Sequence, residues 1–421
     1  MRIKTHFILL LLAVFTLPPK TRAEQKYEPL PTYLDGSMMP YDFSRETAPT
    51  ALPDSLRPVY ASYVARHGAR YLSGESKMKP VVDALEEGRR NGTLSSTGKD
   101  FLDLIDQIRR TNQGNWGDLS PEGFREERLL GLRLYNILTP LHDGTQKINA
   151  VSSYMPRVVM TMYIAMNSII RQNDTLTVMT DEGHQYDRLV CCFMADPEFA
   201  RYRKEGAWKK IFDKFLDTYV SPEPARRLFT DTPLSEHKLR KLTFDIYEVL
   251  KANRAAGLPA PTTQWMSVEE YEGCWRASNL QHYLRNTITA ESSLAGKATT
   301  PLLRQIMDDI DMAAASESPQ PVLNGYFGHA ETLLPLLSLM QIPGCYDLTT
   351  DYDQLEKSWR VEDITPLGAN LIILLSRGPS GRNYVTMQLN GRVVTPMPGQ
   401  PEVVAWDDLK NFWNNLLINN P

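Results

Sequence analysis

The chain has 421 residues, of which 42% are hydrophobic and 23% are charged. This composition is ample for a buried core and excludes an intrinsically disordered protein, and the length suggests two or three domains, or one large domain with an insertion. The formal net charge of −4 argues against a general nucleic-acid binder, because phosphate backbones require a broad basic surface.

The first 23 residues have the features of a secretory signal peptide. Arg2 and Lys4 precede an apolar run over 7–17, and Ala23 provides the small residue expected at a cleavage site. The run is too short to span a bilayer comfortably, and no later segment is apolar for long enough. We therefore expect an exported protein, periplasmic or secreted, with no membrane association after cleavage. Cleavage removes four basic and no acidic residues, which moves the net charge from −4 to −8.

The first half of the mature chain alternates strand and helix patterns. Residues 24–55 predict an irregular lead-in, and a β-prone run covers 59–64. Helical patterns follow at 81–110, broken near Asn91-Gly92, and at 124–138, where Ser120 is a candidate N-cap and Pro121 fits the first helical position. The next expected elements are a strand over 148–154, a helix over 156–170 and a strand over 176–179.

The second half begins with a long, almost wholly helical block over 181–290. Strands are expected at 321–327, 370–375 and 383–394, the last with a type I′ hairpin at Asn390-Gly391, and a final helix at 407–417. Strands that alternate with helices predict an α/β sheet domain. We expect this domain to comprise 24–180 and 291–421, with 181–290 inserted as an all-helical cap domain.

The sharpest chemical signal is the segment Arg66-His67-Gly68-Ala69-Arg70, which directly follows the first predicted strand. Two guanidiniums suit a phosphate group, because each can donate two charge-assisted hydrogen bonds from one plane. An imidazole beside that phosphate can attack phosphorus and form a covalent phosphohistidine. The cationic neighbours lower the pKa of His67 and keep it neutral, and therefore nucleophilic.

This segment resembles the signature of the histidine acid phosphatases, the branch of the histidine phosphatase superfamily that includes phytases. The sequence His-Ala-Glu at 329–331, where most relatives carry His-Asp, resembles the subgroup of multiple inositol polyphosphate phosphatases. Residues 119–123 look like the family's Leu-Thr-x-x-Gly helix start. Residues 152–157 look like the strand-to-helix junction that supplies a third phosphate-binding arginine. The resemblance implies a phosphoglycerate mutase-like central sheet flanked by helices.

The resemblance also implies a role for each site residue. His67 would be the nucleophile, and Glu331 would protonate the leaving group and then assist water. The remaining site residues would bind the scissile phosphate: Arg66, Arg70, Arg157 and His329. A phosphate next to Glu331 would raise the pKa of that carboxyl by like-charge repulsion.

No metal or other cofactor is expected, because the seven histidines show no HxH or HxxxH pair and the chain has no P-loop or EF-hand pattern. The cysteines also lack the spacing of a metal site. In an exported protein, Cys191 or Cys192 could be bridged to Cys274 or Cys345, and buried free thiols are an equal alternative.

The implied activity is removal of phosphates from inositol polyphosphates, including the hexakisphosphate phytate. The alternatives are a broad-specificity acid phosphatase and a non-catalytic phosphate-binding protein, which would keep the arginines without a working acid. The expected partner is a small polyanionic molecule, and the expected state is a monomer. Lys77, Lys79 and Lys99 are candidates for contacts with outer phosphates.

Overall fold

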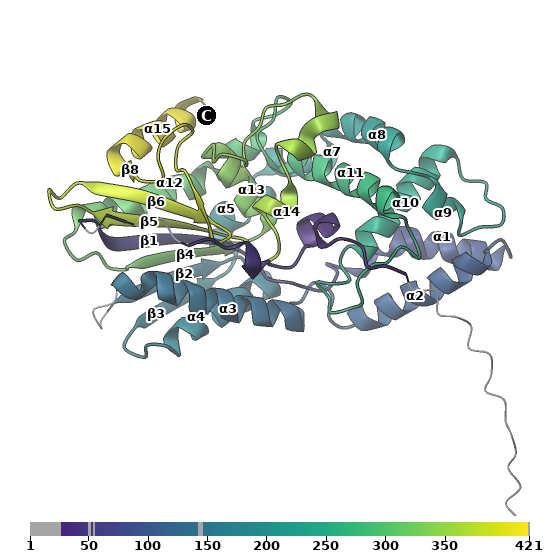
Figure 1. Cartoon of the computed structure of the whole chain (residues 1–421), viewed down its shortest axis with the longest axis horizontal. Helices are drawn as coiled ribbons and strands as arrows, with labels where there is room; N and C mark the ends of the chain where they lie inside the picture. Colours follow the sequence, from purple (N-terminus) through teal and green to yellow (C-terminus); the bar gives the residue numbers. More distant parts are fainter. Residues whose placement is uncertain (1–26, 49–51, 54, 142–145, 420–421) are drawn as a thin grey trace, which may run out of the picture.

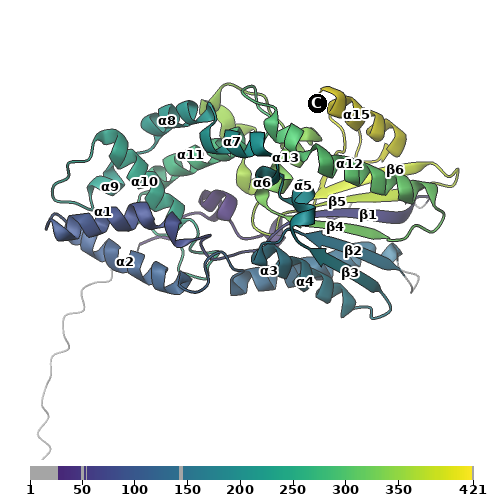
Figure 2. The same ribbon diagram turned by 180° about the vertical axis from the view of Figure 1, so that it is seen from behind.

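The computed structural model describes residues 27–48, 52–53, 55–141 and 146–419, so the predicted signal peptide lies outside the described residues. An eight-stranded sheet occupies one end of the molecule and a block of helices the other (Figures 1 and 2). Helices cover both faces of the sheet. The predicted α/β class is confirmed. No helix in the described ranges is long and apolar enough to cross a membrane.

The sheet has the strand order β3-β2-β4-β1-β5-β6-β7, with β8 paired to β6. The four strands from β3 to β1 are parallel, and the pairs beyond β1 are antiparallel. The strands are β1 (Arg57–Arg66), β2 (Lys147–Ser152), β3 (Thr177–Glu182), β4 (Leu323–Gly328), β5 (Asn370–Arg377), β6 (Asn383–Leu389), β7 (Arg392–Val394) and β8 (Val404–Ala405).

The helices fall into a sheet-covering set and a helical block. The sheet-covering set is α3 (Pro121–Leu138), α4 (Pro156–Ile170), α12 (Leu294–Ala315), α13 (Ala330–Leu339) and α15 (Trp406–Asn419). The longer helices of the block are α1 (Lys79–Arg90), α2 (Ser96–Asn112), α7 (Pro197–Glu205), α8 (Trp208–Tyr219), α10 (Glu236–Leu250) and α11 (Val268–Asn286). The four-residue helices are α5 (Asp187–Val190), α6 (Cys192–Ala195), α9 (Glu223–Arg226) and α14 (Val361–Ile364). The 3₁₀ segments are η1 (Thr32–Met38), η2 (Phe43–Arg45), η3 (Glu75–Lys77), η4 (Thr139–Leu141), η5 (His184–Tyr186) and η6 (Tyr352–Lys357).

Strand β1 runs through the middle of the sheet and is buried on both faces. Tyr63 packs with the cluster under α3 and α4, whereas its neighbour Val64 belongs to the core on the opposite face. This alternation follows from the two-residue period of a strand. A central, doubly buried strand gives a rigid support to the segment that follows Arg66.

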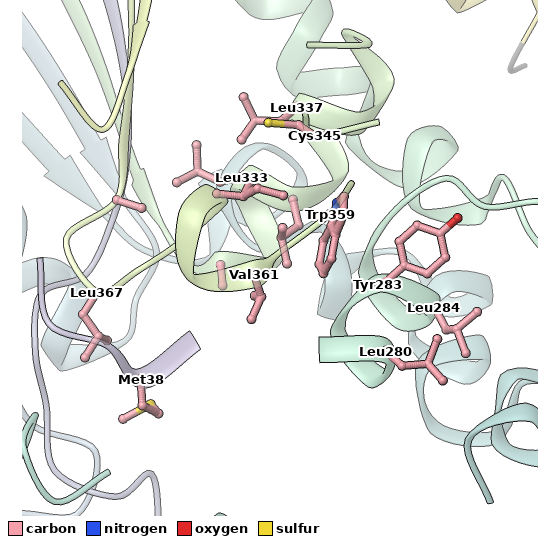
Figure 3. Packing of buried hydrophobic residues seen from close by; sticks show 14 of the residues in the cluster. Met38, Leu280, Tyr283, Leu284, Leu333, Leu337, Cys345, Trp359, Val361 and Leu367 are labelled. Carbon is pink, nitrogen blue, oxygen red and sulfur yellow. The ribbon is translucent and has the colours of Figure 1, made fainter. Parts of the chain in front are cut away.

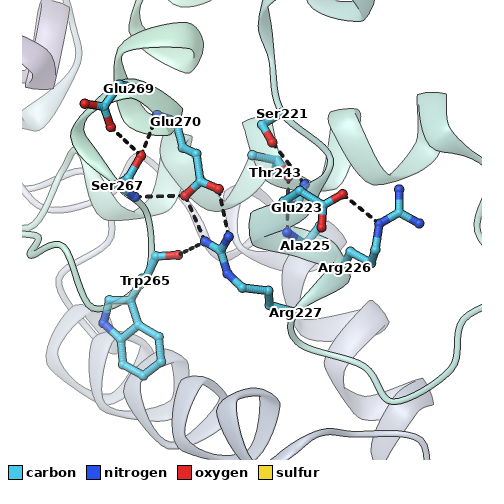
Figure 4. Close-up of polar contacts among 10 residues, drawn as sticks. All are labelled: Ser221, Glu223, Ala225, Arg226, Arg227, Thr243, Trp265, Ser267, Glu269 and Glu270. Atoms are coloured by element: carbon cyan, nitrogen blue, oxygen red, sulfur yellow. Dashed lines mark hydrogen bonds and ion pairs between the residues drawn. The ribbon is translucent and has the colours of Figure 1, made fainter.

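The helical block is tied together by charged contacts as well as apolar ones. At the end of α9, the Arg227 guanidinium donates to both carboxylate oxygens of Glu270, at 2.7 and 2.8 Å, and Glu270 also accepts from the backbone of Ser267 at the start of α11 (Figure 4). Helices α1 and α2 pack in this block too, where the backbone N–H of Thr230 donates to the carbonyl of Thr93. The division of the chain at residues 180 and 290 stays a prediction.

A continuous apolar core joins the helical block to the sheet. Trp359 lies edge-on to Tyr283 of α11, with ring centres 5.5 Å apart, beside Leu333 and Leu337 of α13 (Figure 3). The Asn279 side chain adds two hydrogen bonds of 2.9 Å to the backbone at 359–361. Truncating a buried Trp of this kind costs about 3–5 kcal/mol. This junction fixes α11 relative to α13.

Most predicted elements are present, with several differences. Asn390 and Gly391 have φ angles of 50° and 71°, as the predicted type I′ hairpin between β6 and β7 requires. Ser120 accepts from the backbone of Gly123 and caps α3, as predicted. Helix α12 was not predicted, and the lead-in predicted as irregular contains the largely buried η1. All four cysteines are buried free thiols, so the disulfide alternative is wrong.

Candidate active site

The two predicted motifs meet because β1 and β4 are adjacent parallel strands. Arg66 is the register partner of Gly328, so His67 and His329 leave neighbouring strands at the same edge of the sheet. The backbone N–H of His67 donates to the carbonyl of Gly328, and the two imidazole centres are 5.6 Å apart. The carboxyl ends of parallel strands are the usual place for a ligand site in such a sheet.

The loop after β1 packs against helix α3 and is hydrogen-bonded to it. Glu126 accepts hydrogen bonds from the backbone N–H groups of Ala69 at 2.7 Å and Tyr41 at 2.9 Å. A β-carbon at Gly68 would lie 2.9 Å from a carboxyl oxygen of the buried Glu127, and one at Gly123 would lie 2.1 Å from the Ala69 carbonyl oxygen. Glycine is therefore required at Gly123, where the obstacle is backbone, whereas a β-carbon at Gly68 would displace the Glu127 side chain.

The hydrogen bonding of His67 leaves one ring nitrogen free. Its Nδ1 lies 3.0 Å from the carbonyl oxygen of Gly68. Because a carbonyl oxygen only accepts, Nδ1 carries the proton and the Nε2 lone pair is available. Burial, together with the charges of Arg157, Arg66 and Arg70, holds the pKa of His67 well below its usual value. The neutral, nucleophilic form therefore persists into acidic pH.

Three arginines surround His67, and no carboxylate among the described residues pairs with them. Arg66 donates through Nη1 to the carbonyls of Ser37 at 2.7 Å and Thr365 at 2.6 Å, and Arg157 is in the first turn of α4. The Nε atoms of Arg66, Arg70 and Arg157 are buried and have no hydrogen-bond partner in the part of the chain that the structure describes. Burial and the neighbouring guanidiniums lower the pKa of Arg70 to about 9, so it is still charged at neutral pH. A buried cation with no carboxylate partner is costly, so the arrangement favours an anion beside these side chains.

His329 completes the site on the β4 side. Its Nε2 lies 3.2 Å from the Ser153 hydroxyl, and its backbone N–H donates to Thr332 Oγ1 at 3.0 Å. Burial and the charge of Arg157 lower the pKa of His329 to about 3, so the ring is neutral. A neutral imidazole fixed at this point can donate one hydrogen bond to a bound oxyanion.

Glu331 is in the first turn of α13 and pairs with Arg203 of α7. Arg203 Nη2 lies 2.9 Å from Glu331 Oε1, and Arg203 Nε donates to the Asn286 side chain at 2.9 Å. Burial alone would raise the pKa of Glu331, but the positive charge of Arg203, the strongest of the opposing influences, helps to hold this pKa below its usual value. The carboxylate is therefore ionised before a substrate arrives.

The structure brings all six predicted site residues together and adds several that sequence reasoning missed. The added residues are Ser153, Glu126, Arg203, His282 and Asn286. Ser153 lies inside the segment 152–157 quoted for Arg157. Arg203, His282 and Asn286 lie in the helical block and belong to no recognisable motif, so only the tertiary structure reveals them. The candidate Lys79 forms an exposed ion pair with Asp83, and Lys99 is exposed on α2.

Comparison with known proteins assigns this arrangement to a family. A model of the histidine phosphatase superfamily, branch 2, matches residues 60–390 and spans both motifs. The chain belongs to this superfamily. The branch 2 assignment agrees with the fold and confirms the resemblance inferred from the motifs. The chain is thus of the histidine acid phosphatase class of enzymes.

Individual relatives of this histidine phosphatase are distant but cover nearly its whole length. Human multiple inositol polyphosphate phosphatase 1 is 24% identical over 448 residues, which cover 96% of this chain and 87% of the human protein. The Bifidobacterium longum multiple inositol polyphosphate phosphatase in complex with inositol hexasulfate has a TM-score of 0.75 at 17% identity, covering 91% of this chain and 97% of the other. The D. castellii phytase has a TM-score of 0.69 at 16% identity, and the match covers 92% of this chain and 85% of the phytase chain.

Proposed function

We propose that this histidine phosphatase hydrolyses the phosphate esters of inositol polyphosphates, including the hexakisphosphate. The observation that carries the proposal is the group of Arg66, Arg70 and Arg157 around the free Nε2 of His67, none of them paired with a carboxylate of the described ranges. The names of the human and B. longum relatives, and the inositol hexasulfate bound to the latter, support this substrate class.

In the proposed first step, His67 Nε2 attacks phosphorus, a P–N bond forms and the bond to the inositol oxygen breaks. The three arginines and His329 bind the non-bridging oxygens and stabilise the charge of the transition state. Glu331 gives its proton to the leaving oxygen. In the second step, the Glu331 carboxylate takes a proton from water, the water oxygen bonds to phosphorus and the P–N bond breaks. Phosphate is released and His67 is regenerated.

The ionised state of Glu331 in the free protein is compatible with this role. A bound phosphate brings at least one negative charge next to the carboxyl, and like-charge repulsion raises the pKa of Glu331. The same phosphate charge competes with the Glu331 carboxylate for the Arg203 guanidinium. Substrate binding would therefore favour the protonated form that the first step needs.

Turnover of inositol hexakisphosphate, with product isomers separated by chromatography, tests the substrate. We expect stepwise phosphate release. Fast hydrolysis of simple monoesters with none of the hexakisphosphate would favour the broad-specificity acid phosphatase. Phosphate binding without hydrolysis of either would favour the non-catalytic binding protein.

We also propose that residues 1–23 direct export to the periplasm or the medium, and that the mature protein is a monomer. The amino-terminal sequence of protein recovered from the periplasmic fraction and the medium tests the first point. Cleavage after Ala23 is expected, and an uncleaved protein confined to the cytoplasm would contradict it. Light scattering of the mature protein tests the second.

A further inference from the structure

Arg285, in the last turn of α11, is a charged side chain for which the proposed mechanism has no use. Its Nε is buried and has no hydrogen-bond partner, and no ion pair joins it to a carboxylate of the described residues. The guanidinium carbon lies 5.2 Å from the centre of the Trp208 ring, which holds the side chain by a cation–π contact. The structure therefore holds this cation in place without neutralising it.

The end of α11 borders the active site at two points. Asn286, next to Arg285, accepts from Arg203, which in turn pairs with Glu331. One turn earlier, His282 Nε2 lies 3.0 Å from the Ser37 hydroxyl, and the carbonyl of Ser37 accepts from Arg66. Helix α11 contacts both α7 and α13, and Figure 2 shows α7 and α13 between α11 and the sheet.

The electrostatic surroundings of Arg285 favour an anion. Burial and the nearby charge of Arg203 lower the pKa of Arg285 to about 10, so it remains protonated at neutral pH. Arg203 adds a second positive charge that acts on Arg285, and Glu331 and Glu248 are the acidic groups whose charges oppose it. Both carboxylates already have partners: Glu331 is paired with Arg203, and Glu248 is paired with Lys251 and accepts a hydrogen bond from Ser278.

We propose that Arg285 binds a second phosphate group of the substrate whose first phosphate is attacked by His67. The inference rests on the proposed function and deepens it, because it makes α11 of the helical block a determinant of substrate choice. A polyphosphorylated ring carries a second phosphate that Arg285 could bind, whereas a simple monoester has only the phosphate that His67 attacks. The guanidinium fork matches a phosphate group in charge and geometry.

The test compares Arg285→Met with the wild type on two substrates. Methionine keeps an unbranched apolar stem against Trp208 and removes the charge. We expect kcat/KM for inositol hexakisphosphate to fall about 10- to 100-fold, as for a lost charge-assisted hydrogen bond, while kcat/KM for p-nitrophenyl phosphate stays within about twofold. The inhibition constant of inositol hexasulfate, measured against p-nitrophenyl phosphate, should rise by a similar factor.

Two further variants control the test. Arg110→Met removes an exposed cation of α2 and should leave kcat/KM for both substrates unchanged. Arg285→Lys keeps the charge and should recover most of the hexakisphosphate activity, which also shows that the fold tolerates replacement. An equal loss on both substrates, or no loss on the hexakisphosphate, would overturn the second phosphate site. Failure of the wild type to hydrolyse the hexakisphosphate would instead overturn the proposed function.

Discussion

Arg203 Nη2 lies 2.9 Å from Glu331 Oε1 and joins the helical block to the first turn of α13 at the active site. Arg203 is itself fixed by Asn286 and by the Phe193 ring, whose centre is 4.9 Å from the guanidinium carbon. The proposed proton donor is therefore held ionised by a residue from a different part of the chain. Its protonation depends on the charge that enters the site.

Replacing Arg203 with methionine should move the pH profile of the enzyme. Arg203 lowers the pKa of Glu331, so its loss raises that pKa. A general acid acts in its protonated form, and the basic limb of kcat/KM for an alkyl phosphate such as glycerol phosphate should shift to higher pH by about one unit. Arg203→Lys keeps the positive charge and should shift the basic limb less. An unchanged basic limb in Arg203→Met would contradict the pairing.

Glu331→Gln should separate substrates by their leaving groups. The amide cannot give a proton, so hydrolysis of glycerol phosphate or an inositol phosphate should slow by about 10²–10⁴-fold. The first step with p-nitrophenyl phosphate should slow far less, because its leaving group departs as an anion. Pre-steady-state release of p-nitrophenol measures that step. A comparable loss on both substrates in the first step would argue against Glu331 as proton donor.

Gly123→Ala tests whether α3 sets the position of the nucleophile loop. The new methyl group would lie 2.1 Å from the Ala69 carbonyl oxygen, so the loop after His67 has to move. We expect kcat to fall at least tenfold, since displacements of about 1 Å in an active site have effects of this size or larger. Gly74→Ala is the matched control, because its β-carbon would meet nothing closer than 3.6 Å. Equal activity of the two variants would refute the role of this contact.

Glu126 and Glu127 are adjacent buried carboxyls, and we expect their replacement by glutamine to change the stability of the fold in opposite directions. Burial raises the pKa of Glu127 well above its usual value, and neither of its carboxyl oxygens has a hydrogen-bond partner among the residues that the structure places. In the unfolded chain this group ionises near pH 4.3, so from there to its folded pKa stability falls by about 1.4 kcal/mol per pH unit. Glu127→Gln removes that loss and should be more stable than the wild type at pH 7, with little difference at pH 4.

Glu126→Gln should instead destabilise the fold. One of the two backbone donors, Ala69 or Tyr41, loses its acceptor, at a cost of about 1–3 kcal/mol. Urea unfolding of both variants at pH 4 and pH 7 measures the contrast. A Glu127→Gln variant less stable than the wild type at pH 7 would show that Glu127 is not a neutral, unpartnered group.

Local patterns were enough to predict the frame of the site. The strand before His67, the Ser120 cap and the helix at 156–170 depend on side-chain periodicity, capping and the fixed φ of proline, all of which act within one element. The family motifs then placed Arg157, His329 and Glu331 around the nucleophile. The structure brings these residues together because β2, β4 and β1 are neighbours in the sheet.

What the sequence did not reveal depends on contacts between distant segments. Helix α12 has Pro301 in its interior, which weakens its helical pattern, and packing against α13 and β1 maintains it. Segment η1 is stabilised mainly by burial against α11 and α14. Arg203 and Arg285 have no local signature, since an arginine on a helix is ordinarily solvated. Their importance appears only when α7 and α11 are placed beside Glu331.

The central claim is that His67 carries the phosphoryl group, and rapid quenching with ³²P-labelled substrate tests it most directly. We expect a base-stable, acid-labile label that maps to His67 in the wild type, with neither label nor turnover in His67→Ala. Full activity in His67→Ala, or a label on another residue, would contradict the account.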